Sequence, residues 1–342
     1  MSGAAQPAKV AVIGAGSWGT TVAALVATHA PTTLWVRNAE LASTIASTHE
    51  NPQYLAGIEL PAALVATASL EAACAGAGVI VLGVPSHGLR AVLTEAVAFV
   101  DGNAALVSLS KGVEQGTNLR MTEVVAQVLP GHDPARIGVL TGPNLAREVA
   151  SGQPTATVVG MRDPVVAGQL QQLFMSPTFR VYTNPDVVGC EIAGALKNVL
   201  AIGAGMADGL GYGDNTKAAL MTRGLAELAR LGISLGGDSL TFAGLAGMGD
   251  LIATCSSPQS RNRHVGVELG RGRPLEEIVA EMNMVAEGVK TTAAVLDLAA
   301  REKVEMPLAE FVGRVLHQGA RPADLVPELM GRRAKPELHG IR

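Results

Sequence analysis

The sequence predicts an α/β protein of two domains, in which an open parallel sheet with helices on both faces precedes an all-helical domain. Short β-rich runs alternate with helical patterns through about residue 185, as such sheets require, and only helical patterns follow Pro185. A length of 342 residues suits two domains and leaves ample chain for a buried core. We therefore expect a first domain over residues 1–185 and a second over residues 186–342.

Seven β-rich runs predict the strands of the first domain: Lys9–Ile13, Thr33–Val36, Val79–Val84, Ala104–Leu109, Ile137–Leu140, Ala156–Val159 and Phe179–Tyr182. Apolar residues at helical spacing predict a helix at Thr20–Ala30 and, in the second domain, helices at Cys190–Gly213, Asn215–Leu231, from Asp250, Pro274–Met282, Thr291–Lys303 and Leu308–His317. Ligands of open parallel sheets bind outside the carboxyl ends of the strands. Lys111 and the turn from Gly142 to Asn144 stand at two such ends.

Composition argues against several classes of protein. A formal net charge of −4, without a basic run interleaved with aromatics, argues against a nucleic-acid partner. The longest uncharged run, Val10–Val36, contains three glycines and Pro31, so it fits a strand and a helix better than a spanning helix, and we expect no stable membrane insertion. The N-terminus lacks the order of a signal peptide, which favours a cytoplasmic protein. The cysteines lie far apart and the histidines are scattered, so we predict reduced thiols and no metal site.

The segment Gly14 to Gly19, GAGSWG, joins the first strand to the first helix. It has the G-x-G-x-x-G spacing in the context that a dinucleotide-binding Rossmann domain requires. Gly14 makes the tight turn, Gly16 lets backbone approach a pyrophosphate, and Gly19 packs the helix against the strand. The helix start then places amide groups and the positive end of its dipole toward the phosphates.

Arg37 stands at the end of the second predicted strand, about 20 residues after the glycines. An acidic residue there would bind the ribose hydroxyls of NAD, whereas an arginine can bind the 2′-phosphate of NADP. No acid stands at the end of this strand, so the sequence favours NADPH over NADH. The alternative is that Arg37 is only a solvated strand end.

Lys197, beside Asn198, interrupts the apolar helix predicted at Cys190–Gly213. A buried ammonium group without partners costs several kcal/mol or more, so packing alone does not explain it. One interpretation is a lysine whose stem is buried and whose ammonium reaches the surface. The other is an acid–base group, because burial and a neighbouring cation such as Lys111 would lower its pKa from about 10.4.

The order of these features resembles that of the bacterial NAD(P)-dependent sn-glycerol-3-phosphate dehydrogenase family. The similarity covers nearly all of residues 8 to 335. It rests on the stretches GAGSWGT, VPSH, SKG, TGPN, GALKNVLAIGAGMADG, AGMGDL, SRNR and AEGVKT. Each stretch is weak alone, but all of them in this order are specific. The resemblance implies a Rossmann domain followed by a helical domain of the 6-phosphogluconate dehydrogenase C-terminal type.

The resemblance also implies roles for individual residues. Lys197 matches the family's proton acceptor. The residues that match the family's substrate contacts are Lys111, Gly142, Asn144, Lys197, Asp250, Ser260, Arg261 and Asn262. The residues that match its cofactor contacts are Ser17, Trp18, Arg37, Lys111, Ala146, Arg261, Val285 and Glu287. The glycines of the turn, Gly14, Gly16 and Gly19, are also expected to bind the cofactor. Asn144 departs from the family, which more often carries serine or threonine there; an amide can still donate and accept hydrogen bonds.

The chemistry of two stretches agrees with these roles. Ser260, Arg261 and Asn262 offer a hydroxyl, a planar cation and an amide to a phosphate. Asp250 would repel a phosphate, so we expect it at the glycerol hydroxyls or at Lys197. The alternative is a helix N-cap after Gly249.

The activity implied is reversible interconversion of dihydroxyacetone phosphate and sn-glycerol 3-phosphate by hydride transfer, which in the family supplies the backbone of phospholipids. A homodimer is also expected from the family. One alternative is a dehydrogenase of the 6-phosphogluconate or hydroxyisobutyrate type, which lacks the SRN run after AGMGD. Another is a non-catalytic dinucleotide sensor or scaffold, which would have little need for Lys197 and a phosphate-binding cluster.

Overall fold

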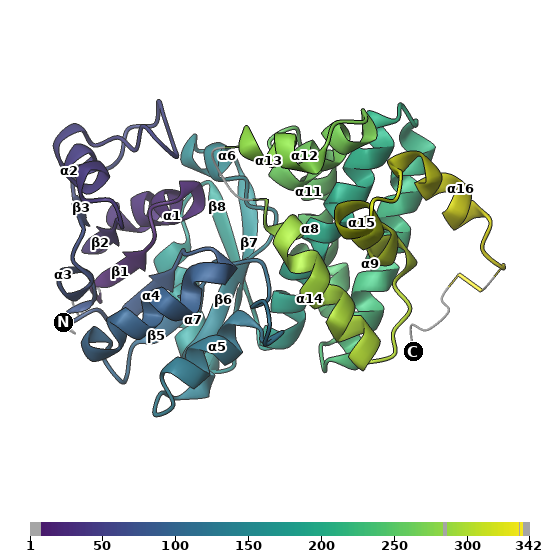
Figure 1. The fold of residues 1–342 in the computed structure, drawn as a ribbon. Coiled ribbons are helices and arrows are strands. Elements are labelled where there is room, and N and C mark those ends of the chain that lie inside the picture. The colour runs from purple at the N-terminus through teal and green to yellow at the C-terminus, as the bar shows by residue number, and fades with distance from the viewer. Residues whose placement is uncertain (1–7, 283–285, 335, 338–342) are drawn as a thin grey trace. The chain divides into compact units, whose positions relative to one another are not determined.

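The structure, a computed structural model, describes residues 8–282, 286–334, 336 and 337. The chain divides into two compact units (Figure 1). The first contains the chain up to Ser110 and Met121–Val187, and the second contains Lys111–Arg120 and the chain from Val188 onward. Each unit has its own hydrophobic core.

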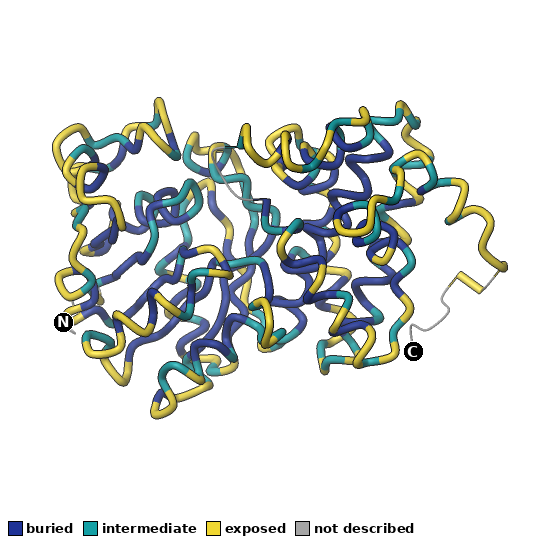
Figure 2. Tube along the Cα trace, in the orientation of Figure 1, coloured by how far each residue is buried: buried dark blue, intermediate teal, exposed yellow. Residues whose placement is uncertain are grey.

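The first unit is built on one eight-stranded sheet in the order β3-β2-β1-β4-β5-β6-β7-β8. The strands are β1 (Val10–Ile13), β2 (Thr32–Trp35), β3 (Leu64–Thr67), β4 (Val79–Leu82), β5 (Ala105–Ser108), β6 (Ile137–Thr141), β7 (Thr155–Gly160) and β8 (Phe179–Asn184). The central strands β1, β4 and β5 are buried throughout (Figure 2), which explains their continuous apolar runs. The seven predicted strands are confirmed. β3 was missed because this edge strand buries only Leu64 fully and leaves Val65 57% exposed.

The sheet is not wholly parallel, which corrects the prediction. β7 runs antiparallel to β6, whereas β8 runs parallel to β7. The connection from β6 to β7 contains one short helix, the five-residue α6 (Ala146–Ala150). The eleven-residue α7 (Pro164–Phe174) makes a full crossover, as a parallel neighbour requires.

Two groups of helices pack against the sheet. One contains α1 (Ser17–Ala27), which contacts β1, β2, α6 and α7. The other contains α3 (Leu70–Cys74), α4 (Leu89–Ala96) and α5 (Met121–Val128), which contact one another in sequence order. α2 (Ala39–Thr48) lies against the edge strand β3. The sheet therefore receives helices from two sides, as an α/β layer architecture requires.

The described part of the second unit is helical. Its helices are α8 (Val187–Gly209), α9 (Asp214–Ser234), α10 (Ser239–Ala243), a π-helical turn η4 (Leu245–Gly249), α11 (Asp250–Ser256), α12 (Arg261–Gly270), α13 (Leu275–Ala280), α14 (Glu287–Arg301), α15 (Pro307–Gln318) and α16 (Leu325–Met330). α8 is long and apolar enough to cross a membrane by length and composition. However, 94% of the 18-residue segment with the highest hydropathy in this helix is buried inside the structure, as in a core helix.

The segment Lys111–Arg120 packs with the second unit, although the sequence analysis placed it in the first domain. Val113 is 2% exposed and belongs to the core of the helical unit. Arg120 Nη1 donates to Glu191 Oε2 of α8 at 2.6 Å. This segment therefore brings Lys111 into the unit that carries Lys197.

Candidate active site

Lys197 lies on a buried turn of α8, among the small and apolar residues that make this helix the centre of the second core. Its side chain is 7% exposed, so its ammonium does not reach the surface. Nζ donates to Asp250 Oδ1 at 2.6 Å and to Thr254 Oγ1 at 2.7 Å. The structure thus contradicts the surface-reaching interpretation and gives this lysine two buried polar partners.

Asp250 is the first residue of α11 and binds two lysines at once. Its Oδ1 accepts from Lys197, and its Oδ2 accepts from Lys111 Nζ at 2.7 Å. Gly249 is the N-cap of this helix, and no side chain caps it. The N-cap interpretation of Asp250 is therefore wrong, and the carboxylate, which is 3% exposed, is a counter-ion shared by two cations.

The surroundings of Lys197 tune its proton affinity. The pKa of Lys197 is lowered to about 8, mainly by burial and also by the positive charge of Lys111, whereas Asp250 opposes both effects. A lysine with a pKa near 8 is present both as ammonium and as amine at physiological pH. Lys197 can therefore release or accept a proton there, as a general acid–base group must.

Two amides lie beside this cluster. Asn198, next to Lys197, donates from Nδ2 to the Lys111 carbonyl at 2.9 Å and accepts at Oδ1 from Asn262 Nδ2 at 2.9 Å. The Oδ1 atom of Asn262 in turn accepts from the backbone N–H of Gly288 at 2.9 Å. Asn262 is 8% exposed, so its side chain is committed to the protein interior.

The start of α12 presents Ser260 and Arg261. Ser260 is the N-cap, and its hydroxyl accepts from the Arg263 N–H at 3.2 Å. The exposed Arg261 guanidinium has its pKa lowered by partial desolvation and raised by the charge of Glu287, the first residue of α14. A helix N-terminus with an arginine on its first turn is suited to an anion.

The glycine turn of the first unit fits a dinucleotide. Gly14 has a φ of +116°, and a Cβ there would lie 2.8 Å from the Gly83 backbone. A Cβ on Gly19 would lie 2.0 Å from the Gly14 carbonyl oxygen, so α1 packs directly on the turn. Gly16 faces open space and is the N-cap of α1 without a side-chain cap. These features leave a helix N-terminus accessible to a pyrophosphate.

Among the described residues of the first unit, four buried side-chain polar atoms have no hydrogen-bond partner: Trp18 Nε1, Arg136 Nε, Thr141 Oγ1 and Asn144 Nδ2. Asn144 Oδ1 accepts from Thr157 Oγ1 at 2.9 Å, which assigns the buried Nδ2 as the atom without a partner. Gly142, with a φ of +136°, makes the turn that follows β6. Buried groups without partners are costly. Arg136 lines a separate cavity, so the atoms of Trp18, Thr141 and Asn144 are the candidates for ligand contacts.

The other predicted cofactor residues of the first unit lie near the starts of helices. Ser17 begins α1 and donates to the Tyr54 carbonyl at 2.7 Å, and Ala146 begins α6. Arg37 is exposed, two residues after β2, and within the described residues it has no hydrogen-bond or ion-pair partner. Val285 lies outside the described residues. Residues 8–282, 286–334, 336 and 337 contain no cluster of three or more potential metal ligands of the His, Cys, Asp and Glu types.

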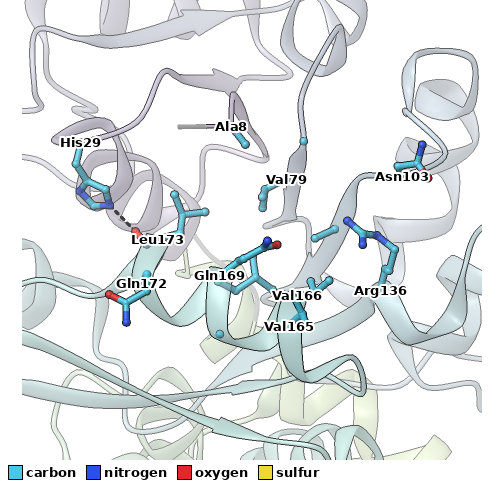
Figure 3. Close-up of a pocket in the computed structure, with 14 residues that line it drawn as sticks. Ala8, His29, Val79, Asn103, Arg136, Val165, Val166, Gln169, Gln172 and Leu173 are labelled. Atoms are coloured by element: carbon cyan, nitrogen blue, oxygen red, sulfur yellow. Dashed lines mark hydrogen bonds between the residues drawn. The ribbon is translucent and has the colours of Figure 1, made fainter. Parts of the chain in front are cut away.

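A separate cavity of about 850 Å³ opens in the first unit (Figure 3). It lies beside the start of β4, the start of β5 and α7, with Val79, Arg136 and Gln169 among its lining residues. These are the amino ends of the strands, opposite the glycine turn. Since such sheets bind ligands outside the carboxyl ends, this cavity is not part of the candidate active site.

Comparison with known proteins agrees with this geometry. Family models described as the N-terminus and the C-terminus of NAD-dependent glycerol-3-phosphate dehydrogenase match residues 9–167 and 186–327. The chain belongs to this dehydrogenase family. The resemblance and the predicted fold class, a Rossmann-type domain followed by a helical domain, are thereby confirmed.

Relatives at high identity support the family assignment. Glycerol-3-phosphate dehydrogenase [NAD(P)+] 2 from Sphingopyxis alaskensis is 57% identical over 315 residues, which cover 92% of this chain and 93% of the relative. The enzyme from Corynebacterium glutamicum is 52% identical over 96% of this chain and 99% of its own length. The crystal structure of glycerol-3-phosphate dehydrogenase from Coxiella burnetii superposes with a TM-score of 0.90 at 36% identity, covering 95% and 99% of the two chains.

Sequence reasoning missed Thr254 as a partner of Lys197. It follows Asp250 by four residues, and its hydroxyl also donates to the Asp250 carbonyl at 2.6 Å. Residues four apart share one face of a helix, so the spacing carried a signal once Asp250 was placed on a helix. Asn198 was noticed beside Lys197, but its two partners lie far away in the sequence and left no local signal.

Proposed function

We propose that this chain interconverts dihydroxyacetone phosphate and sn-glycerol 3-phosphate, with NAD or NADP as its cofactor. The observation that carries the proposal is the buried cluster in which Asp250 binds both Lys197 and Lys111. Such a cluster suits proton transfer at an alcohol or ketone oxygen. The relatives named above bear the name of this activity.

Lys197 is the proposed acid–base residue. When the alcohol is oxidised, the neutral amine accepts the hydroxyl proton; when the ketone is reduced, the ammonium returns that proton to the oxygen. A bound nicotinamide supplies the other half of the chemistry, because it accepts or donates the hydride at the substrate carbon. Asp250 and Thr254 orient Nζ, and Asp250 also stabilises the ammonium form.

The start of α12 is the proposed phosphate site. The first N–H groups of a helix have no partner within the helix, and they point along the axis toward an anion. Ser260 adds a hydroxyl and Arg261 a planar cation with several donors. The side chain of Asn262 is held by Asn198 and Gly288, so its proposed substrate contact uses the backbone N–H. We further propose substrate contacts from Lys111, Gly142 and the unpartnered Nδ2 of Asn144.

The proposed dinucleotide site comprises Gly14, Gly16, Ser17, Trp18, Gly19, Arg37, Ala146, Val285 and Glu287, together with Lys111 and Arg261. Gly16 leaves room for a pyrophosphate, and the unpartnered Trp18 Nε1 is a donor for it or for a ribose. We propose a preference for NADPH, because the exposed Arg37 stands where a 2′-phosphate is read.

The cellular setting is also a proposal. The reducing direction would supply sn-glycerol 3-phosphate for phospholipid synthesis. We propose a cytoplasmic homodimer, which the family resemblance implies.

The test is the initial rate of NADPH oxidation with dihydroxyacetone phosphate, repeated with NADH and with unphosphorylated dihydroxyacetone. Rapid turnover that requires the phosphate supports both the reaction and the substrate. Protein that binds NADPH but turns over no dihydroxyacetone phosphate contradicts the proposal and favours another acidic hydroxy substrate or a dinucleotide sensor.

A further inference from the structure

The cavity of about 850 Å³ in the first unit combines a buried apolar wall with a few polar groups. The wall includes the first residues of β4 and β5, Val79 and Ala105, together with Leu170 of α7, and all three are buried. Every residue that lines the cavity belongs to the first unit, so one compact unit forms it. Mostly apolar cavities of about 300–1,000 Å³ with a few polar groups are typical of small-molecule sites.

Arg136 brings a cation without a counter-ion to this cavity. It stands directly before β6, and its Nε is buried without a hydrogen-bond partner. Within the described residues its guanidinium forms no hydrogen bond and no ion pair. Figure 3 shows its head group turned toward Gln169, on the side of the cavity where Val79 lies. A buried donor without a partner is costly, and a carboxylate can accept from two guanidinium N–H groups at once.

The carboxylates near Arg136 are bound to backbone groups. Asp133 Oδ1 accepts from the Ala135 N–H at 2.9 Å. Asp163, whose own N–H donates to the Ala135 carbonyl, caps α7 by accepting at Oδ1 from the Val165 N–H at 2.8 Å. Neither carboxylate pairs with Arg136, and the described residues that line the cavity include no aspartate or glutamate. The charge of Arg136 is therefore left for a ligand.

Gly168, in the interior of α7, leaves space at the cavity that it lines. Glycine destabilises a helix interior relative to alanine, so its presence there requires a reason. A Cβ on Gly19 or Gly138 would lie 2.0 or 2.2 Å from a backbone oxygen, so close packing explains those two glycines. A Cβ on Gly168 would meet no atom within 4 Å. Close packing therefore does not require this glycine, whereas an open cavity does.

We propose that the cavity binds an organic monocarboxylate with an apolar body. The carboxylate pairs with the Arg136 guanidinium. The apolar body lies against Val79, Ala105 and Leu170. A single arginine matches a single negative charge, whereas a phosphate monoester carries about −1.5 to −2. Because the cavity lies at the amino ends of the strands, this site is separate from the glycine turn, which follows the carboxyl end of β1.

The test is calorimetric titration of the full chain with octanoate, at saturating NADPH so that the dinucleotide site is filled. We expect one saturable site per chain. Octanol, which lacks the charge, and octyl phosphate should each bind at least about tenfold more weakly, since a hydrogen-bonded charge is lost or mismatched. Decanoate should bind about fifteenfold more tightly, because each buried methylene strengthens binding about fourfold, or about 0.8 kcal/mol.

Two variants with matched controls locate the ligand. Arg136→Gln should weaken octanoate binding at least about tenfold. Arg90→Gln should not, although it removes the same charge from a partly buried arginine of α4, where Nη2 donates to Gln127. Gly168→Leu should abolish binding by filling the cavity, whereas Gly168→Ala should leave it nearly unchanged. Both Gly168 variants should keep or raise the midpoint of thermal unfolding, because leucine and alanine favour a helix more than glycine.

Four results would overturn the proposal. Absence of saturable binding by the native chain would exclude the site, and equal binding of octanol and octanoate would exclude the role of Arg136. Undiminished binding to Gly168→Leu would place the ligand elsewhere. A sedimentation coefficient that changes in Gly168→Leu would assign the cavity to a second copy of the chain. Binding is measured directly, so each result is independent of whether the chain turns over dihydroxyacetone phosphate.

Discussion

The pH dependence of catalysis is the sharpest consequence of the Lys197 cluster. A pKa of about 8 leaves about a tenth of Lys197 as neutral amine at pH 7, whereas an ordinary lysine near 10.4 would be neutral in less than about 0.1% of molecules. The buried position thus increases the amount of base a few hundredfold. In the oxidising direction, kcat should rise tenfold per pH unit up to about pH 8 and then level off. In the reducing direction, which needs the ammonium, kcat should fall above that pH.

Replacing Lys111 tests the cause of this titration. The Lys111 charge lowers the pKa of Lys197. Lys111→Met should therefore shift the pH-dependent part of the kcat profile, its limb, to higher pH for both the oxidation and the reduction reaction. Burial remains the larger cause, so the limb should stay below the ordinary lysine value. The pKa of Lys197 depends on all the groups around it. The variant must therefore keep Asp250, Thr254 and the buried Cys255 unchanged.

The assay is kcat at saturating substrate and cofactor from pH 6 to 10, measured in both directions. Lys217→Met is the matched control, because Lys217 is paired with Asp214 and Asp208 and lies outside the cluster. It should leave the limb unmoved. A native profile without a limb near pH 8 would refute the acid–base role of Lys197. A limb that Lys111→Met leaves in place would refute the assigned influence of Lys111.

Three further changes test separate parts of the structure. Lys197→Ala should lower turnover by about 10²–10⁴-fold while NADP binding, measured by calorimetry, stays nearly intact; substantial remaining turnover would exclude its catalytic role. Arg37→Ala should weaken NADPH binding about 10–100-fold and NADH binding far less; equal losses would mean that Arg37 does not bind the 2′-phosphate. Burial raises the pKa of Glu227 to about 7, although the Leu308 and Ala309 N–H groups oppose this. Because the folded pKa exceeds the unfolded value of 4.5, the unfolding free energy should fall by about 3 kcal/mol as pH rises from 4.5 to 7. Glu227→Gln should remove that slope in urea titrations, and an unchanged slope would assign it to other groups.

Local patterns were sufficient for much of the fold. The glycine turn and seven strands could be predicted because central strands are buried on both faces and read as continuous apolar runs. β3 escaped because it is a half-exposed edge strand. The reversal at β7 was missed because the periodicity of apolar residues carries no information on strand direction.

Of the candidate site, the sequence could predict those residues whose type is unusual for their local pattern. Lys197 was conspicuous, since a charge inside an apolar helix requires an explanation. The second charge that shapes it was harder to place, because Lys111 follows β5 and was assigned to the first domain. The 139 residues that separate Lys111 from its ion-pair partner Asp250 exclude any helical or strand periodicity between them.

The placement of Lys111 has a consequence for how the acid–base group is built. Val113 in the helical core and Arg120 on Glu191 anchor the segment that carries Lys111 to the second unit. Both lysines and their shared Asp250 therefore belong to one compact unit. Since burial and neighbouring charge set the pKa of Lys197, its value near 8 is a property of the fold of that unit. The lowered pKa of the proposed acid–base residue is thus set by packing and charge within the second unit.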